Sequence, residues 1–254
     1  MHLRTFSILL LALSFGLFAN GEPQSITLAG SSTLTRVLLP LKPGVEAAYG
    51  VEIRLIPVGS GRGLAELAEN RVDAAMLSGP VGYLVEKLRE RSGCSLRVEQ
   101  LEQLRLPHNH KAEVVALLHP ALPIRSLSRE QLRAVLAGEI ANWSALGGPD
   151  LAITVVLPDE LDGVRATVDT ELMEGRAFSP KAQIVPRIPD TIPVVLATPG
   201  AVGVLPRASL PAAAISAEIT PTLFVTLYIV AFNARMEDDP RTGMVLNSLH
   251  SRAR

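Results

Sequence analysis

Residues 26–80 constrain the fold of this chain most strongly, because short apolar runs alternate there with turns of small residues. Residues 26–29 and 51–58 have the length and composition of strands. They are followed by the turns Gly30-Ser31-Ser32-Thr33 and Gly59-Ser60-Gly61-Arg62-Gly63. Each turn precedes an amphipathic segment with helical spacing. The stretch therefore predicts two successive strand-turn-helix units.

These two turns also predict a chemistry. The first amides of a helix have no intrahelical acceptor, and the helix dipole favours negative charge beside them. Neither turn matches a dinucleotide fingerprint or a P-loop, and no nucleophile elbow is present. We expect a site that holds an oxyanion and predict no catalytic residue, so the chain is not expected to be an enzyme.

The remainder of the chain continues the alternation of strands and helices. Apolar runs at 112–118, 153–157 and 223–232 predict further strands, and Ser128-Arg129-Glu130-Gln131 is a capping box that predicts a helix start. Pro40 and Pro43 should break the first helix early. The order predicts an α/β fold, with ligands at the carboxyl ends of the strands.

Composition excludes several classes of function. The chain has 254 residues with 24 basic and 25 acidic side chains, a net charge of −1, and no basic block. We therefore expect no nucleic-acid binding. The single cysteine, Cys94, cannot form an intramolecular disulfide. His108 and His110 lack a third ligand at short spacing, so we predict neither a metal nor a cofactor.

The beginning of the chain predicts export. An apolar run at residues 6–19 follows Arg4 and ends in the small residues Ala19 and Gly21. The run is short for a membrane span and typical of a signal peptide, which we place at residues 1–21. A retained anchor is the alternative. After processing, the protein would be periplasmic or extracellular and would not span the membrane.

Several motifs together resemble the phosphate-type periplasmic substrate-binding proteins of ABC importers. The resemblance covers almost all of the mature chain, and its most specific part contains Trp143. The motifs are Gly30-Ser31-Ser32-Thr33, Val58-Gly59-Ser60-Gly61, Val72-Asp73-Ala74-Ala75-Met76, the segment from Leu127 through Asn142-Trp143 to Gly147-Gly148-Pro149, and Pro199-Gly200-Ala201-Val202-Gly203.

This resemblance implies a type 2 periplasmic-binding-protein fold, with two α/β lobes that are each a mixed sheet flanked by helices. It places the first lobe at residues 22–110 plus 213–254 and the second at 111–212. A small anion, phosphate or a related ion, would be held between the lobes, and an ABC permease would be the partner. The ligand-binding residues implied or inferred are Ser31, Ser32, Thr33, Ser60, Gly61, Arg62, Ser78, Gly163 and Arg165.

Two departures from the family pattern bear on the ligand. Ser78 stands where phosphate binders have an Asp that accepts the ligand's proton. The third turn, Pro158-Asp159-Glu160-Leu161-Asp162-Gly163-Val164, has lost the family's Arg, Ser and Thr and keeps only Gly163. A carboxylate close to a dianion would repel it by several kcal/mol.

Two outcomes therefore stay open for the third turn. Its carboxylates turn outward and the site is weaker, or the ligand is not a simple phosphate. Arg62 or Arg165 could supply positive charge, although either could equally face solvent. The small residues of the first two turns could also serve only as turn and cap residues. The competing function is a periplasmic interaction or sensory module without tight phosphate binding.

Overall fold

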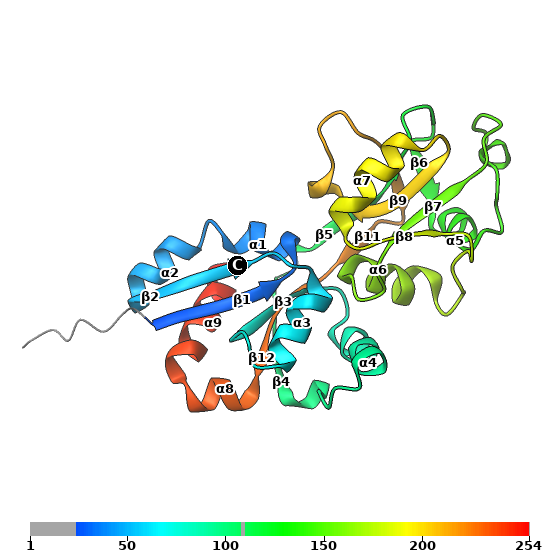
Figure 1. Cartoon of the computed structure of the whole chain (residues 1–254). Helices are drawn as coiled ribbons and strands as arrows, with labels where there is room; N and C mark the ends of the chain where they lie inside the picture. The colour runs from blue at the N-terminus through cyan, green and yellow to red at the C-terminus, as the bar shows by residue number, and fades with distance from the viewer. Residues whose placement is uncertain (1–23, 108–109, 254) are drawn as a thin grey trace, which may run out of the picture.

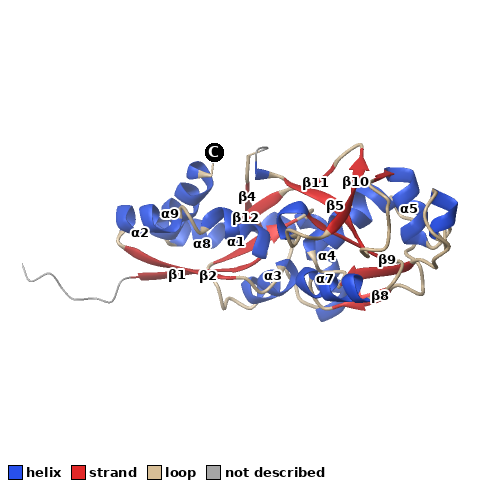
Figure 2. Ribbon diagram, turned by 90° about the horizontal axis from the view of Figure 1, so that it is seen from above, coloured by secondary structure: helices blue, strands red, loops and turns tan. Residues whose placement is uncertain are grey.

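The computed structural model describes residues 24–107 and 110–253, which form two sheets side by side along an elongated molecule (Figures 1 and 2). The predicted signal peptide at 1–21 and His108 lie outside the described residues. Among the described residues, no helix is both long and apolar enough to cross a bilayer. The two-lobed α/β fold predicted for the chain is confirmed.

The first sheet has the strand order β2-β1-β3-β12-β4. Strand β1 pairs in parallel with β2 and β3, whereas β12 is antiparallel to β3 and β4. The strands are β1 (Gln24–Gly30), β2 (Val51–Ile56), β3 (Ala74–Ser78), β4 (Leu101–Arg105) and β12 (Leu227–Phe232).

Helices cover both faces of this sheet, and the period-two alternation of β1 explains why. Ile26 and Leu28 point into one core, and Ala29 points into a second core with Leu64 of α3. The first helix breaks as predicted, because α1 ends at Leu38 before Pro40. The helices are α1 (Ser32–Leu38), α2 (Lys42–Tyr49), α3 (Ser60–Ala68), α4 (Val81–Ser92), α8 (Asn233–Asp238) and α9 (Pro240–Arg252).

The second sheet has the order β6-β10-β5-β9-β7-β8, and β11 also pairs with β5. Its central strand β5 is buried from Val114 to Leu118, in agreement with its continuous apolar run. The strands are β5 (Ala112–Leu118), β6 (Ser126–Ser128), β7 (Thr154–Pro158), β8 (Gln183–Val185), β9 (Ala201–Pro206), β10 (Ile215–Thr220) and β11 (Leu223–Val225).

The helices of the second lobe are α5 (Arg129–Ala137), α6 (Gly163–Val168) and α7 (Ile188–Ala197). The predicted capping box is present at α5, where Ser128 and Gln131 each accept a hydrogen bond from the other's backbone amide. Trp143 is fully buried and donates its indole N–H to the carbonyl of Gly200 at 2.8 Å. This bond joins two of the motifs that carried the resemblance.

Three local predictions need correction. Residues 223–232 are two strands in different sheets, since β11 pairs with β5 and β12 returns to the first sheet after Thr226. Because β10 and β11 pair within the second sheet, we propose that the second lobe extends to about residue 225 in place of the predicted 212. Helix α7 was not predicted, because Pro189 and Pro193 are unusual inside a helix and obscure its pattern in the sequence. Pro189 lies in the first turn, where its missing N–H costs nothing.

Candidate anion-binding site

A small cavity lies where the two lobes meet, at the carboxyl ends of β1 and β3, and has a volume of about 40 Å³. We call it the inner cavity. The first lobe contributes hydroxyl-bearing turns, and the second lobe contributes one carboxylate and one guanidinium. Its lining consists of Ser31, Ser32, Thr33, Pro57, Gly59, Ser60, Ser78, Asp162, Val164, Arg187, Ile188 and Pro189.

The first turn is held in place by its glycine. Gly30 has a φ of +144°, and a Cβ there would lie 2.0 Å from the carbonyl oxygen of Met76. Ser31 is buried and caps α1, because its Oγ accepts from the Leu34 amide at 3.3 Å. Ser32 and Thr33 are half-buried and line the cavity. Ser31 thus has a structural role, whereas Ser32 and Thr33 are available to a ligand.

The second turn brings two predicted serines together. Ser60 and Ser78 are both buried, their Oγ atoms are 3.1 Å apart, and Ser60 Oγ accepts from the Ser78 amide at 3.1 Å. Gly59 precedes α3 and provides no side-chain cap, so the first amides of α3 are not satisfied in that way. The beginning of α3 therefore offers N–H donors to the cavity.

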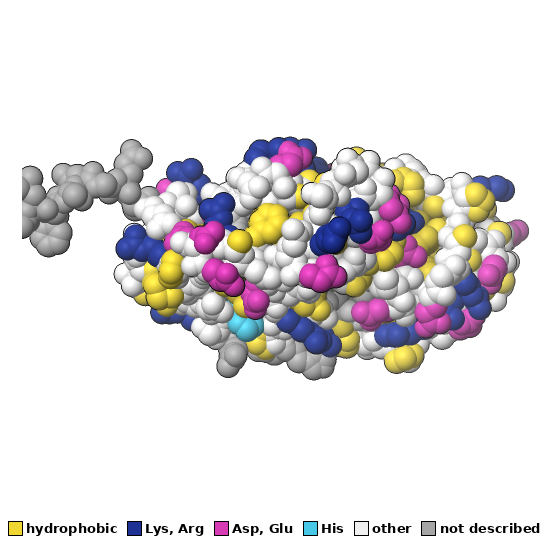
Figure 3. All heavy atoms as spheres, turned by 90° about the horizontal axis from the view of Figure 1, so that it is seen from below, with side chains coloured by type: hydrophobic (Ala, Val, Ile, Leu, Met, Phe, Trp, Pro, Cys, Tyr) yellow, Lys and Arg dark blue, Asp and Glu magenta, His cyan; other side chains and the backbone are white. Residues whose placement is uncertain are grey.

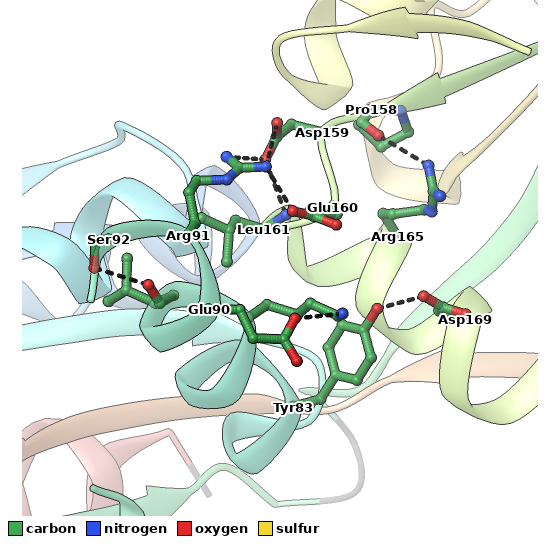
Figure 4. A network of polar contacts seen from close by, with 12 residues as sticks. Tyr83, Glu90, Arg91, Ser92, Pro158, Asp159, Glu160, Leu161, Arg165 and Asp169 are labelled. Atoms are coloured by element: carbon green, nitrogen blue, oxygen red, sulfur yellow. Dashed lines mark hydrogen bonds and ion pairs between the residues drawn. The ribbon is translucent and has the colours of Figure 1, made fainter. Parts of the chain in front are cut away.

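The third turn sends two of its carboxylates away from the inner cavity. Asp159 and Glu160 both accept hydrogen bonds from Arg91 of α4, across the gap between the lobes (Figure 4). Burial pushes the pKa of Asp159 up, but the hydrogen bonds from Arg91 and from the Leu161 amide outweigh it and hold that pKa below its usual value. Asp159 and Glu160 therefore do not line the inner cavity.

Asp162 does line the inner cavity, unlike the other two carboxylates. Its Oδ1 accepts from the Val164 amide at 2.8 Å and from the Arg165 amide at 3.4 Å, so it caps α6 with its own side chain. Burial raises the pKa of Asp162 to about 6, although these two hydrogen bonds act in the opposite direction. The amides at the start of α6 are thus occupied by a carboxylate of the same turn.

Gly163 and Arg165 have roles other than lining the inner cavity. A Cβ on Gly163 would lie 1.8 Å from the Ser78 carbonyl oxygen, so this glycine lets the two lobes touch. The guanidinium of Arg165 stacks on Phe178, 3.8 Å from the ring centroid. It also donates to the Pro158 carbonyl at 3.3 Å (Figure 4). Burial lowers the pKa of Arg165. Arg165 does not line the inner cavity in this arrangement, so its predicted role in anion binding stays a prediction.

The other two predicted residues, Gly61 and Arg62, line a neighbouring cavity. Arg62 is mostly exposed and pairs with Glu66 one helical turn away, at 2.5 Å. A Cβ on Gly61 would lie 2.3 Å from Cβ of Leu161 in the other lobe. Gly61 is therefore a second position where the lobes touch.

The cation that reaches the inner cavity is Arg187, which sequence reasoning missed. It follows β8, a strand parallel to β7, and precedes α7, so it occupies a fourth strand-to-helix turn. Its side chain is 59% exposed and pairs with Asp190 at 3.2 Å. The short strand before it was a usable signal, but the surrounding prolines concealed the pattern.

The resulting site contains hydrogen-bond donors from both lobes and one carboxylate. Hydroxyls and amides come from the first lobe, and the second lobe adds Arg187 and the carboxylate of Asp162. Within residues 24–107 and 110–253, no group of three or more His, Cys, Asp or Glu side chains could hold a metal ion. On the face shown in Figure 3, basic and acidic side chains are interspersed.

Comparison with known proteins agrees with this architecture. The chain is 28% identical over 195 residues to the phosphate-binding protein PstS of Bacillus subtilis, covering 74% of this chain and 59% of that protein's length. Its structure is similar, at a TM-score of 0.72 and 16% identity, to a Clostridium perfringens protein described as a substrate-binding protein of a phosphate ABC transporter and solved with bound phosphate. The alignment covers 89% of this chain and 93% of that one.

A second solved structure, an ABC-type phosphate transport receptor from Vibrio cholerae, has a TM-score of 0.63 and 21% identity and covers 88% of this chain and 93% of its own. At these identities the two structures establish the fold. The family model for the PBP superfamily domain matches residues 19–226. The resemblance to phosphate-type binding proteins is confirmed, and this chain belongs to the PBP superfamily.

Proposed function

We propose that this protein is an exported, non-enzymatic solute-binding protein that holds a small oxyanion, most simply phosphate, between its two lobes. One observation carries the proposal. The starts of α1 and α3 border a single cavity with the hydroxyls of Ser32, Thr33 and Ser60, and Arg187 approaches it from the other lobe. Amides, hydroxyls and a guanidinium together form the usual environment of a bound oxyanion.

The connections between the lobes support a closing motion. The chain leaves the first sheet between β4 and β5 and returns between β11 and β12. Two adjacent crossings of this kind allow one lobe to rotate against the other. The ion would first bind to the hydrogen-bond donors of the first lobe, and the second lobe would then close over it.

The relatives support the same ligand class. Their descriptions refer to phosphate binding and ABC transport, so we propose an ABC permease as the partner of this chain. The segment at 1–21 supports export to the periplasm or the outside of the cell.

A second candidate function is a periplasmic interaction or sensory module without tight phosphate binding. Two observations favour it. Asp162 occupies the amides at the start of α6, and Arg91 joins the lobes through Asp159. Both features would reduce how strongly the binding of a dianion favours closure of the lobes.

Thermal unfolding of the mature protein with a panel of anions distinguishes the two functions. The panel contains phosphate, sulfate, molybdate, tungstate and small carboxylates. A ligand at one hundred times its Kd adds about 2.7 kcal/mol of stability, which is easily detected. Stabilisation by one oxyanion, reduced in Ser60→Ala, supports the solute-binding function. The same unfolding curve with every anion would contradict it and favour the module.

A further inference from the structure

A second and larger cavity adjoins the inner one and has a volume of about 360 Å³. We call it the outer cavity. It shares Gly59, Ser60, Asp162 and Arg187 with the inner cavity, so the two meet along one boundary. The remaining lining residues are Val58, Gly61, Arg62, Ala65, Leu88, Arg91, Asp159, Leu161 and Pro186.

The two volumes suit different parts of one ligand. A single water needs about 10–15 Å³, so the inner cavity of about 40 Å³ has room for a small ion and no organic group. The outer cavity lies within the range of about 300–1,000 Å³ that small-molecule sites have. An inorganic ion would leave the outer cavity to water.

Asp162 places an open hydrogen-bond acceptor at the boundary between the cavities. Its Oδ1 accepts two backbone hydrogen bonds, whereas its Oδ2 has no hydrogen-bond partner among the described residues. The inner cavity otherwise offers hydroxyls, amides and Arg187. A fully ionised phosphoryl group only accepts hydrogen bonds, so it cannot satisfy Oδ2. A hydroxyl group next to the phosphoryl group could.

The outer cavity has the groups that recognise such an organic part. Arg62, Arg91 and Arg187 carry guanidinium donors, and Asp159 carries a carboxylate acceptor. Val58, Leu88, Leu161 and Pro186 add apolar surface for a carbon skeleton. Planar donors and acceptors beside apolar surface are suited to a hydroxylated molecule.

We propose that the ligand is a small phosphomonoester with hydroxyl groups, whose phosphoryl group occupies the inner cavity and whose organic part occupies the outer cavity. The hydroxyl next to the ester donates to Asp162 Oδ2. This inference rests on the proposed oxyanion site and narrows the class of its ligand.

Titration calorimetry of the mature protein at pH 7.5 tests the proposal. The probes are inorganic phosphate, glycerol 3-phosphate, glucose 1-phosphate and phenyl phosphate, which lacks a hydroxyl. We expect the two hydroxylated esters to bind at least tenfold more tightly than phosphate, and phenyl phosphate to show a smaller gain. Binding of phosphate with no gain for the esters would overturn this inference and leave the proposed function standing. Absence of binding by all four probes would overturn both.

Two substitutions test which residues produce the higher affinity for hydroxylated esters. Ala65 is half-buried on α3 and lines only the outer of the two cavities, so Ala65→Phe should remove the ester preference and leave phosphate affinity within threefold. Ala68→Phe on the same helix lines neither cavity and is the control. Asp162→Asn should reduce the preference for hydroxylated esters over phenyl phosphate. An unchanged ester preference in Ala65→Phe would overturn the assignment of the organic part to the outer cavity.

Discussion

Arg91 of α4 donates two hydrogen bonds to Asp159 of the opposite lobe, with nitrogen–oxygen distances of 2.9 and 3.0 Å (Figure 4). The same guanidinium reaches Glu160 at 2.9 Å, and nearby Tyr83 donates to Asp169. We call these contacts the interlobe network. Burial and the hydrogen bond with Asp169 both raise the pKa of Tyr83. The phenol therefore stays protonated as the donor.

The interlobe network predicts the effect of Arg91→Ala on lobe closure. Exposed ion pairs contribute about 0.2–1 kcal/mol each, so their loss should open the ligand-free protein several-fold more often and change phosphate affinity less than about fivefold. The radius of gyration from small-angle X-ray scattering should increase. Arg89→Ala is the control, because Arg89 pairs with Glu86 on its own helix. An identical radius in both variants would contradict the prediction.

Gly163→Ala should block closure by steric overlap. The added Cβ would lie 1.8 Å from the Ser78 carbonyl oxygen, a contact that only separation of the lobes relieves. We expect phosphate affinity to fall at least tenfold, with a larger radius of gyration that phosphate does not reduce. Gly82→Ala is the matched control, since nothing lies within 4 Å of its Cβ. Normal compaction of Gly163→Ala by phosphate would exclude this role.

Ser60→Ala removes a hydroxyl that lines the inner cavity and also the acceptor of the Ser78 amide. A hydrogen bond to a charged group contributes about 1.5–3 kcal/mol, so phosphate affinity should fall at least tenfold. Stability should fall by about 1 kcal/mol, measured by urea unfolding. Ser92→Ala, whose hydroxyl donates to Leu88 within α4, should leave affinity unchanged. Equal affinities in both variants would remove Ser60 from the site.

Arg187→Gln should weaken phosphate binding about tenfold at low ionic strength, because it removes the cation that lines the inner cavity. The difference from the unsubstituted protein should shrink in 0.5 M salt, where charges are screened over about 4 Å. Calorimetry at two salt concentrations measures this. Arg176→Gln is the control, since Arg176 pairs with Glu130 and Glu139 away from the cleft. A salt-independent loss would indicate a structural defect.

The raised pKa of Asp162 predicts a pH dependence with a definite sign. Because the folded-state pKa of about 6 exceeds the usual value of 3.8, its contribution to stability is complete below about pH 4 and is lost as the pH rises through 6. The charged groups around it are Asp159, Arg165 and Arg187. Above pH 6 its negative charge should also oppose anion binding.

Asp162→Asn provides the comparison that isolates this charge. Free phosphate has the same protonation state in both experiments at a given pH. The ratio of the two affinities for phosphate therefore reports the charge of Asp162 alone. We expect the variant to bind phosphate about tenfold more tightly at pH 7.5 and nearly equally at pH 5, as measured by calorimetry. A ratio that does not change with pH would show that Asp162 carries the same charge at both values.

The sequence determined the order of strands and helices from residue 26 to 92 and the residues of the two turns there. Gly30 and Gly59 have the positive φ that favours glycine, and glycine at both turns is visible in the local sequence. Spacing alone placed Ser32, Thr33 and Ser60 beside helix beginnings. The apolar run at 112–118 likewise predicted a strand buried in a sheet.

Tertiary structure decided everything that depends on distant partners. The directions of Asp159, Glu160 and Asp162 follow from Arg91 on another lobe and from the short helix α6, neither of which a local pattern contains. The guanidinium of Arg165 stacks on Phe178 and does not line the inner cavity. Arg187 lines that cavity because β8, the strand before it, pairs with β7. Local sequence sets which backbone groups are free, because those depend on neighbouring residues. The charge that faces them depends on which strands pair, and only the folded chain fixes that.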